Sequence, residues 1–292
     1  MKLLFLISTI SGGGAARVMS NLANRFCEEG NDIFFITNLP PRDDDYPLSP
    51  KIKRVPLLNS KEWNYNPIRK NILQIVRLDK IIKEEKIDVA ISFMGEPNFR
   101  LLMTSAPVKR IISIRNDPKI EYHGIRGLLT RLLFFRADGV VCQTKDVINW
   151  LSPKLRAKSQ VIMNQVKEIF YNTPRQSSDY YVSTGRLTSQ KNNDLLIEAF
   201  HEFGKKHTNA VLRIYGSGTL LPKLKSKVHA LNDDNRILFM GQTDNVPEIL
   251  SHAKAFILSS DYEGMPNGLL EAMAMGLPCI STDCPCGGPR SI

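Results

Sequence analysis

The sequence contains few cysteines and no hydrophobic run long enough to span a membrane. Its five cysteines in 292 residues are too few for a disulfide framework, so we expect a protein of the reducing cytoplasm. Cys27, Cys142 and Cys279 lie in apolar runs, as small core residues do. Cys284 and Cys286 have no second cysteine pair or histidine cluster nearby, which argues against a zinc site. No run reaches the roughly 18 apolar residues that a membrane-spanning helix needs.

The positive charge is confined to one half of the chain. The net charge is +10, and residues 1–173 contain 27 lysines and arginines against 17 acidic residues, whereas residues 174–292 contain 12 of each. The first half is therefore expected to attract phosphates, anionic lipid headgroups or nucleic acid. Basic residues interleaved with aromatic ones along one groove are not evident, so we do not expect a nucleic-acid partner.

Apolar runs of strand length alternate with amphipathic segments of helix length along the whole chain. This alternation predicts βαβ units and parallel sheets, and hence an α/β fold. The expected strands are Lys2–Ser8, Ile33–Thr37, Val55–Leu58, Val89–Phe93, Arg110–Ile114, Val140–Gln143, Val161–Met163, Tyr180–Ser183, Val211–Tyr215, Ile237–Met240, Ala255–Leu258 and Cys279–Thr282. The expected helices include Arg17–Glu29, Ile68–Glu85, Asp194–His207 and Leu269–Met275.

A polar stretch containing Pro174 interrupts this rhythm and suggests two domains. We expect a first Rossmann-like domain over residues 1–168, a linker over 169–179 and a second Rossmann-like domain over 180–292. The chain ends ten residues after Thr282, the last residue of the last expected strand. Because no helix remains to cover the sheet there, we expect the second domain to be truncated.

Glycines follow the first expected strand, where a parallel sheet binds its ligands. Gly12–Gly14 allow the backbone to approach a phosphate, or they form a tight strand–helix turn. Arg17 stands where the third glycine of a dinucleotide-binding fingerprint belongs, so that motif is absent. Gly216 and Gly218 begin a similar pattern that also fails, and no Walker motif occurs.

Two further segments follow expected strands of the second domain. Arg186 and Lys191 lie five positions apart in a polar turn. They could neutralise a diphosphate, or they could be solvated surface charges. Glu263 and Glu271 are separated by seven residues, with Pro266 near the expected start of a helix. A glutamate one turn into that helix can accept the two hydroxyl hydrogen bonds of a ribose, and it can also be an ordinary partner of the helix dipole.

The glycine loop, the G-R-L-x-x-x-K sequence and the E-x7-E sequence occur here in the order seen in the retaining glycosyltransferases of family 4, which the whole chain resembles. The resemblance implies the GT-B fold, in which two Rossmann-like doubly wound domains face a cleft. It also implies a retaining hexosyltransferase that uses a nucleotide-sugar donor and no metal or other cofactor. Asp43–Asp45 resembles a metal-binding D-x-D motif, but we interpret it as a solvated loop.

The resemblance assigns the donor site by position. Arg186 and Lys191 would bind the diphosphate and stabilise the charge that develops on it. Glu271 would hold the ribose hydroxyls, and Glu263 would contact the transferred sugar. The amides of Pro266, Asn267 and Gly268 would cap the sugar and the β-phosphate. Gly13 and Gly14 would approach the phosphates from the first domain.

The sequence departs from the family pattern at two positions. Ala16 stands where many members have glutamate. Arg115, within R-N-D-P, stands where many members have histidine, so we expect it to act there electrostatically. The R-N-D-P, EGMPNGLLEAM and C-P-C-G-G-P sequences resemble the subgroup that builds bacterial surface polysaccharides from UDP-sugars. UDP-linked glucose, galactose and N-acetylhexosamine all remain open as donors.

We expect the acceptor, a glycan or a polyprenyl-diphosphate-linked sugar, on the basic first domain. The segment Gly124–Arg136 combines leucine and phenylalanine with three arginines. It could lie on the anionic inner face of the plasma membrane, or it could pack on the sheet with its arginines outward. Two other functions remain as alternatives: an inactive or binding-only truncated homologue, and a sugar-nucleotide epimerase on the same fold.

Overall fold

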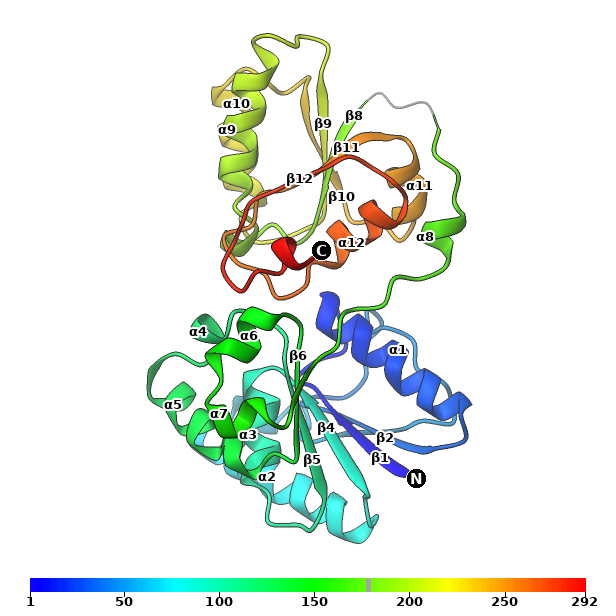
Figure 1. Ribbon diagram of the computed structural model, residues 1–292, viewed down its shortest axis with the longest axis vertical. Helices are drawn as coiled ribbons and strands as arrows, with labels where there is room; N and C mark the ends of the chain where they lie inside the picture. The colour runs from blue at the N-terminus through cyan, green and yellow to red at the C-terminus, as the bar shows by residue number, and fades with distance from the viewer. Residues whose placement is uncertain (177–179) are drawn as a thin grey trace. The chain divides into compact units, whose positions relative to one another are not determined.

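The structure is a computed structural model that describes residues 1–176 and 180–292 (Figure 1). The chain divides into two compact units, Met1–Met163 and Asn164–Ile292. Each unit has its own parallel sheet with helices on both faces, so each is described separately. The predicted α/β class with two doubly wound parallel sheets is therefore confirmed.

The first unit is built on a seven-stranded parallel sheet with the order β3-β2-β1-β4-β5-β6-β7. Leu4 of the central strand β1 pairs with Phe34 on one side and with Ala90 on the other. All three side chains are buried, as expected for strands covered on both faces. The strand bounds are β1 Lys2–Leu6, β2 Asp32–Thr37, β3 Lys53–Pro56, β4 Val89–Phe93, β5 Lys109–Ile114, β6 Gly139–Cys142 and β7 Ser159–Val161.

Helices cover the two faces of this sheet with separate hydrophobic clusters. Met19 of α1 packs on one face with Phe5. Leu78 of α2 and Leu101 of α3 pack on the opposite face with Leu4, and Figure 1 shows α1 and α3 on opposite sides. The helix bounds are α1 Gly14–Glu28, α2 Pro67–Glu84, α3 Gly95–Met103, α4 Pro118–Glu121, α5 Gly124–Leu133, α6 Lys145–Trp150 and α7 Pro153–Arg156, with 3-10 turns Glu62–Asn64 and Phe134–Arg136.

The second unit is built on a five-stranded parallel sheet with the order β10-β9-β8-β11-β12. α9 and α10 cover one face and α8, α11 and α12 the other (Figure 1). The strand bounds are β8 Tyr180–Thr184, β9 Val211–Tyr215, β10 Ile237–Gly241, β11 Ala253–Leu258 and β12 Cys279–Ser281. The helix bounds are α8 Ile169–Asn172, α9 Asn193–Gly204, α10 Leu221–Ala230, α11 Val246–Ser251 and α12 Asn267–Ala274, with 3-10 turns Ser189–Lys191 and Pro289–Ser291.

Each predicted strand overlaps an observed one, but several short helices were not predicted: α3, α4, α6, α7, α8 and α11. α3 was not predicted from the sequence, because it is short and contains Pro97 in its first turn. The predicted linker over residues 169–179 contains α8, whose Phe170 is buried in the core of the second unit. Residues 177–179 of that stretch lie outside the described residues. Within the described ranges, every helix is too short or too polar to cross a bilayer.

Candidate donor site in the second unit

The loop after β8 carries Arg186 to the carboxyl edge of the second sheet. The backbone N–H of Gly185 donates to the carbonyl oxygen of Tyr215 at 2.9 Å, which ties the loop to the end of β9. Arg186 is exposed, and its Nη2 donates to Oε1 of Gln190 at 3.4 Å. The guanidinium therefore lies where ligands of open parallel sheets bind, and it is accessible to them.

Gly216 and Gly218 follow β9 and resemble part of a dinucleotide-binding fingerprint. Close packing explains why both positions are glycine. A Cβ atom on Gly216 would lie 1.8 Å from the carbonyl oxygen of Gly185, and one on Gly218 would lie 2.2 Å from that of Leu187. Gly216 also has a φ of +144°, which disfavours other residues. These glycines therefore let the loops that follow β8 and β9 touch each other through their backbones.

Lys191 and Glu263 form an ion pair at the same edge. Nζ of Lys191 lies 2.6 Å from Oε1 of Glu263, and the Ser260 hydroxyl donates to the same oxygen at 2.7 Å. Glu263 is 6% exposed. A buried carboxylate is costly unless it is paired and hydrogen-bonded, so these two donors account for its burial. The structure thus brings together two of the residues predicted from separate motifs.

Backbone and side-chain hydrogen bonds join the loop of Lys191 to the loop of Glu263. The Ser259 hydroxyl donates to the carbonyl of Lys191 at 2.9 Å. The Asp261 N–H donates to the carbonyl of Gln190 at 2.9 Å, and Nδ2 of Asn192 donates to Oδ1 of Asp261 at 2.6 Å. The Lys191–Glu263 pair is therefore held by the surrounding backbone rather than by two flexible side chains.

A small cavity lies beside this pair, at the carboxyl ends of β8 and β11. Its walls include Ser183, Gly185, Lys191, Asn193 and Ser259. Hydroxyl, amide, ammonium and backbone groups therefore converge on one hollow of about 10 Å³, which has room for about one water molecule. The hollow shows where polar groups meet at the sheet edge, and it is too small to hold a ligand itself.

α12 begins at this edge and packs closely on β8. Pro266 immediately precedes its first residue, Asn267, as the sequence predicted. A Cβ atom on Gly268 would lie 2.8 Å from Oγ1 of Thr184 and 3.2 Å from Cζ of Phe256. Gly268 therefore allows the first turn of α12 to approach β8 and β11, which places the N–H groups of that turn at the sheet edge.

The second carboxylate of E-x7-E lies in α12. Glu271 is 6% exposed, as buried as Glu263. Asn267 accepts a hydrogen bond on Oδ1 from Nδ2 of Asn164 at 2.6 Å, so the start of α12 is anchored to the beginning of the second unit. The two glutamates and the residues between them therefore form one ordered segment. Their predicted roles towards sugar and ribose stay predictions.

The loop after β12 also belongs to this site, and the sequence-based prediction missed it. A Cβ atom on Gly288 would lie 2.0 Å from the carbonyl oxygen of Gly264, so the two loops touch through their backbones. Cys284 is buried there, and burial, followed by the nearby charge of Glu263, raises the pKa of its thiol to about 11. The C-P-C-G-G-P sequence is the signal that could have pointed to this contact.

Residues predicted in the first unit

The glycine loop after β1 has left-handed backbone. Gly12 and Gly13 have φ values of +63° and +81°, which glycine adopts readily and other residues rarely do. Gly13 immediately precedes α1, and Gly14 is its first residue. A Cβ atom on Gly12 or Gly13 would meet no atom within 4 Å. The loop is therefore a tight turn with an open backbone, so both interpretations of the glycines remain compatible with it.

Arg115 directly follows β5 and is shielded from solvent at its Nε atom. Its guanidinium lies 4.4 Å from the ring centre of Phe93, the last residue of β4. Burial lowers the pKa of Arg115 to about 10, and the charge of Glu121 opposes that shift. The side chain is thus held between two strand ends. Sequence reasoning missed Glu121, because nothing in its local pattern indicates burial.

Of the three aspartates at 43–45, Asp43 and Asp44 are exposed, whereas Asp45 makes a structural contact. Oδ2 of Asp45 lies 2.5 Å from Nη2 of Arg54 and accepts from the backbone N–H of Arg42 at 2.8 Å. Among the residues that the structure describes, histidine, cysteine, aspartate and glutamate side chains nowhere gather in threes with the geometry of a metal site.

Comparison with known proteins

Two family models match nearly the whole chain. Residues 12–167 match "Glycosyltransferase Family 4", and residues 165–292 match "Glycosyl transferases group 1". An uncharacterized glycosyltransferase of Methanocaldococcus jannaschii is 29% identical over 279 residues, which cover 84% of this chain and 68% of the relative.

A relative from Campylobacter jejuni is 27% identical over 290 residues. The match covers 97% of this chain and 79% of the relative. Its name describes an alpha-1,4-N-acetyl-D-galactosaminyltransferase that acts on GalNAc-alpha-(1->4)-GalNAc-alpha-(1->3)-diNAcBac-PP-undecaprenol. The crystal structure of Anabaena Alr3699/HepE in complex with UDP-glucose superimposes with a TM-score of 0.78 at 15% identity, covering 99% of this chain and 82% of that one.

The paired parallel sheets and these comparisons define the protein as a glycosyltransferase with the GT-B fold. The chain belongs to glycosyltransferase family 4.

Proposed function

We propose that this enzyme transfers a hexose or N-acetylhexosamine from a UDP-sugar to a polyprenyl-diphosphate-linked or glycan acceptor, with retention of configuration, in the synthesis of bacterial surface polysaccharide. Undecaprenol-linked substrates are named for the Campylobacter relative, and UDP-glucose is bound in the Anabaena structure. Both support the proposal, as do the cations Arg186 and Lys191 at the carboxyl edge of the second sheet.

The Lys191–Glu263 pair beside exposed Arg186 carries this proposal. When the bond between the sugar and the diphosphate breaks, negative charge develops on the leaving diphosphate. Arg186 offers a guanidinium fork and Lys191 an ammonium group, and both stabilise such charge without a metal ion. Glu263, which already holds Lys191, would face the transferred sugar, and Glu271 would accept the ribose hydroxyls. No metal or other cofactor takes part in the proposed reaction.

Thermal-shift titration without added metal tests the donor. UDP, GDP and their sugar conjugates are compared at equal concentrations, because a ligand that binds only the folded state raises the melting temperature by mass action. We expect UDP and one UDP-sugar to stabilise the protein, and GDP to have no effect. UDP release with that UDP-sugar and a polyprenyl-diphosphate-linked sugar then tests transfer. Stabilisation by GDP alone would contradict the assignment of the base.

We also propose that α5 binds the anionic inner face of the plasma membrane. Arg126 and Arg131 of this segment are exposed, as the alternative of a packed helix with outward arginines expects, but most of its apolar side chains are exposed as well. Arg126 pairs with Glu96 at 2.7 Å, and Arg131 lies 4.7 Å from the ring centre of Trp150. The exposed apolar side chains are Ile125, Leu128, Leu129, Leu132 and Phe135, which are 49–82% exposed.

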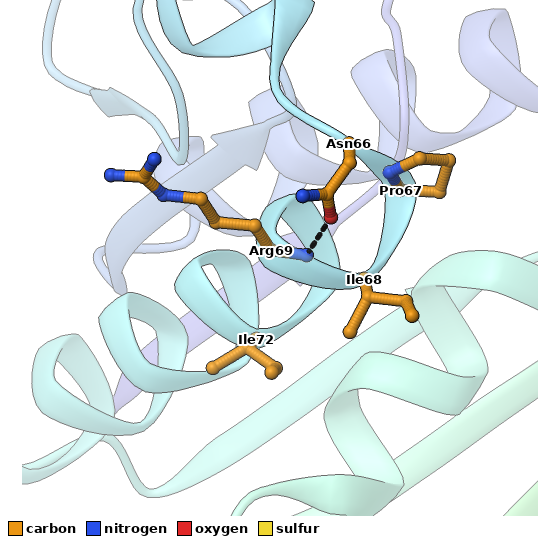
Figure 2. A pocket seen from close by; sticks show the side chains of 5 residues that line it. All are labelled: Asn66, Pro67, Ile68, Arg69 and Ile72. Atoms are coloured by element: carbon orange, nitrogen blue, oxygen red, sulfur yellow. Dashed lines mark hydrogen bonds between the residues drawn. The ribbon is translucent and has the colours of Figure 1, made fainter.

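α2 of the same unit also carries exposed apolar side chains, and α3 contacts both α2 and α5. Ile68 and Ile72 are 74% and 58% exposed, and Figure 2 shows them together on α2, whose first turn is capped by Asn66. Apolar side chains beside basic ones on a unit with the whole charge excess favour an anionic bilayer over a neutral protein surface.

Vesicle flotation tests this membrane surface. We expect the enzyme to float with phosphatidylcholine vesicles that contain phosphatidylglycerol at low salt, and not with phosphatidylcholine alone. The double variant Leu132→Ser/Phe135→Ser should lose flotation, whereas Leu195→Ser, on the exposed part of α9, should retain it. Absence of flotation with the anionic vesicles at low salt would contradict the proposal.

A further inference from the structure

Asn164, the first residue of the second unit, is hydrogen-bonded to the start of α12. Its Nδ2 lies 2.6 Å from Oδ1 of Asn267, the first residue of the helix, and 3.3 Å from the carbonyl oxygen of Met265. Shortly after Asn164, Val166 packs against the hydrophobic cluster that contains Leu269 of α12. The segment that begins at Asn164 is therefore held on α12 by packing as well as by hydrogen bonds.

These two hydrogen bonds fix the orientation of the Asn267 side-chain amide. An asparagine amide can be turned by half a rotation, so its oxygen and its NH2 group are told apart by their partners. The carbonyl of Met265 can only accept, so the Asn164 atom that faces it must be the NH2 group. That group can only donate, so Asn267 must turn its oxygen towards Asn164. The NH2 group of Asn267 is thereby directed away from Asn164.

The NH2 group of Asn267 is available to a ligand. Asn267 is half-buried, and among the residues that the structure describes none accepts a hydrogen bond from its Nδ2. The group lies at the N-terminal end of α12, where backbone N–H groups and the helix dipole favour negative charge. Glu263, the partner of Lys191, precedes the helix in the same segment. A side-chain donor at this place suits an oxygen of a diphosphate.

We propose that Asn164 is a positioning residue of the donor site: it turns the Asn267 amide so that the NH2 group donates to an oxygen of the donor diphosphate. This role rests on the proposed nucleotide-sugar donor, and it adds a side chain to the backbone amides that the resemblance assigns to the phosphate. Asn267 touches the ligand, and Asn164 acts through it.

A double-mutant cycle in ligand binding tests whether Asn164 acts through Asn267. Asn267→Ala should lower the affinity for UDP and for inorganic pyrophosphate about tenfold, because a hydrogen bond to a charged oxygen is lost. Asn164→Ala alone should lower both affinities about threefold, because the Asn267 amide is no longer held in one orientation. In Asn267→Ala, the further change Asn164→Ala should have no effect on either affinity. Two losses that simply multiply would overturn the proposal.

Asn267→Asp separates the ligand contact from the stability of the fold. Its carboxylate still accepts from Asn164 and is favourable at the start of a helix, so the melting temperature should not fall. The affinity for UDP should nevertheless fall at least about tenfold, because the NH2 donor is replaced by an anionic oxygen. The control is Asn209→Ala, which changes an exposed asparagine in the turn before β9 and should alter neither quantity. Native affinity for UDP in Asn267→Asp would also contradict the proposal.

Side-chain NMR tests the amide orientation without any ligand. In protein labelled with nitrogen-15 asparagine, the NH2 signals of Asn164 and Asn267 are identified by their absence from Asn164→Asp and Asn267→Asp. The NH2 protons of Asn164 should exchange with water more slowly than those of Asn267, because Asn164 donates within the protein. Slower exchange at Asn267 would overturn the proposal. If the native chain binds neither UDP, GDP nor pyrophosphate, the proposed function fails, and this exchange measurement alone decides on the Asn164–Asn267 pair.

Discussion

Nζ of Lys191 lies 2.6 Å from Oε1 of Glu263, although the two residues are 72 positions apart in the sequence. The cation that we assign to the donor diphosphate is therefore already paired in the free protein. A donor that binds there must share this ammonium group with Glu263. The pair holds the cation in place before the substrate arrives, which lowers the cost of ordering it.

A double-mutant cycle on this pair should show strong coupling. Lys191→Met leaves the buried Glu263 carboxylate with fewer donors and should destabilise the fold by about 1–3 kcal/mol. In Lys191→Met/Glu263→Gln the loss should be smaller than the sum of the single losses. Urea unfolding measures each variant.

The control for this cycle is Lys205→Met/Glu202→Gln. That pair is 56% and 66% exposed, so its coupling should be near zero because solvent screens it. Additive losses at Lys191 and Glu263 would show that the ion pair is absent in solution.

Gly268→Ala should disturb the start of α12. The added Cβ atom would lie 2.8 Å from Oγ1 of Thr184, and such overpacking typically costs about 1–3 kcal/mol. UDP binding should weaken at the same time, because the first turn of α12 moves. Gly139→Ala is the control, since its Cβ atom would meet only Cγ1 of Ile111, at 3.8 Å. Thermal melting with and without UDP measures both effects, and a Gly268→Ala protein as stable as native would contradict the close approach.

The positions of the strands and long helices could be predicted from the sequence, because they depend on the residues within each segment. Apolar runs such as Lys2–Leu6 have the length of a strand and sharp ends. The predicted bounds of each strand therefore lie within a few residues of the observed ones. The short helix α3 was missed, because Pro97 and Glu96 break its apolar period.

The site could be predicted only where a motif marked it. Arg186, Lys191, Glu263 and Glu271 lie in recognisable sequences, and the structure gathers them in the second unit. Glu121 has no such signal, because its burial depends on how α4 packs against Gly95. Long-range packing of this kind leaves no trace in the local sequence.

Stability should depend on pH through Glu121. Burial raises the pKa of this carboxyl from 4.5 to about 7, so between these values the folded state binds more protons than the unfolded state. Stability contributed by the protonated carboxyl is therefore lost as pH rises through this window, by about 3 kcal/mol in total. The difference in unfolding free energy between the native chain and Glu121→Gln isolates this group. It should favour the variant increasingly from pH 5 towards pH 8, and a difference that is constant with pH would contradict the burial of the charge.

Glu271→Gln should distinguish binding of the ribose from binding of the diphosphate. A glutamine replaces one of the two acceptor oxygens of the carboxylate with an NH2 donor and removes its charge, so it pairs less well with two ribose hydroxyls and affinity for UDP should fall about tenfold or more. Affinity for inorganic pyrophosphate should be unchanged, because Arg186 and Lys191 remain. Competition between the two ligands, followed by thermal shift, measures this. Equal loss for both ligands would place Glu271 on the diphosphate instead.

Calorimetric titration of the native chain and of Arg186→Ala with UDP, in the presence of EDTA, tests the donor site most directly. We predict saturable binding of UDP by the native chain without any divalent metal, and at least about tenfold weaker binding by Arg186→Ala. UDP binding that requires a divalent metal, or that is unaffected by the loss of Arg186, would contradict it.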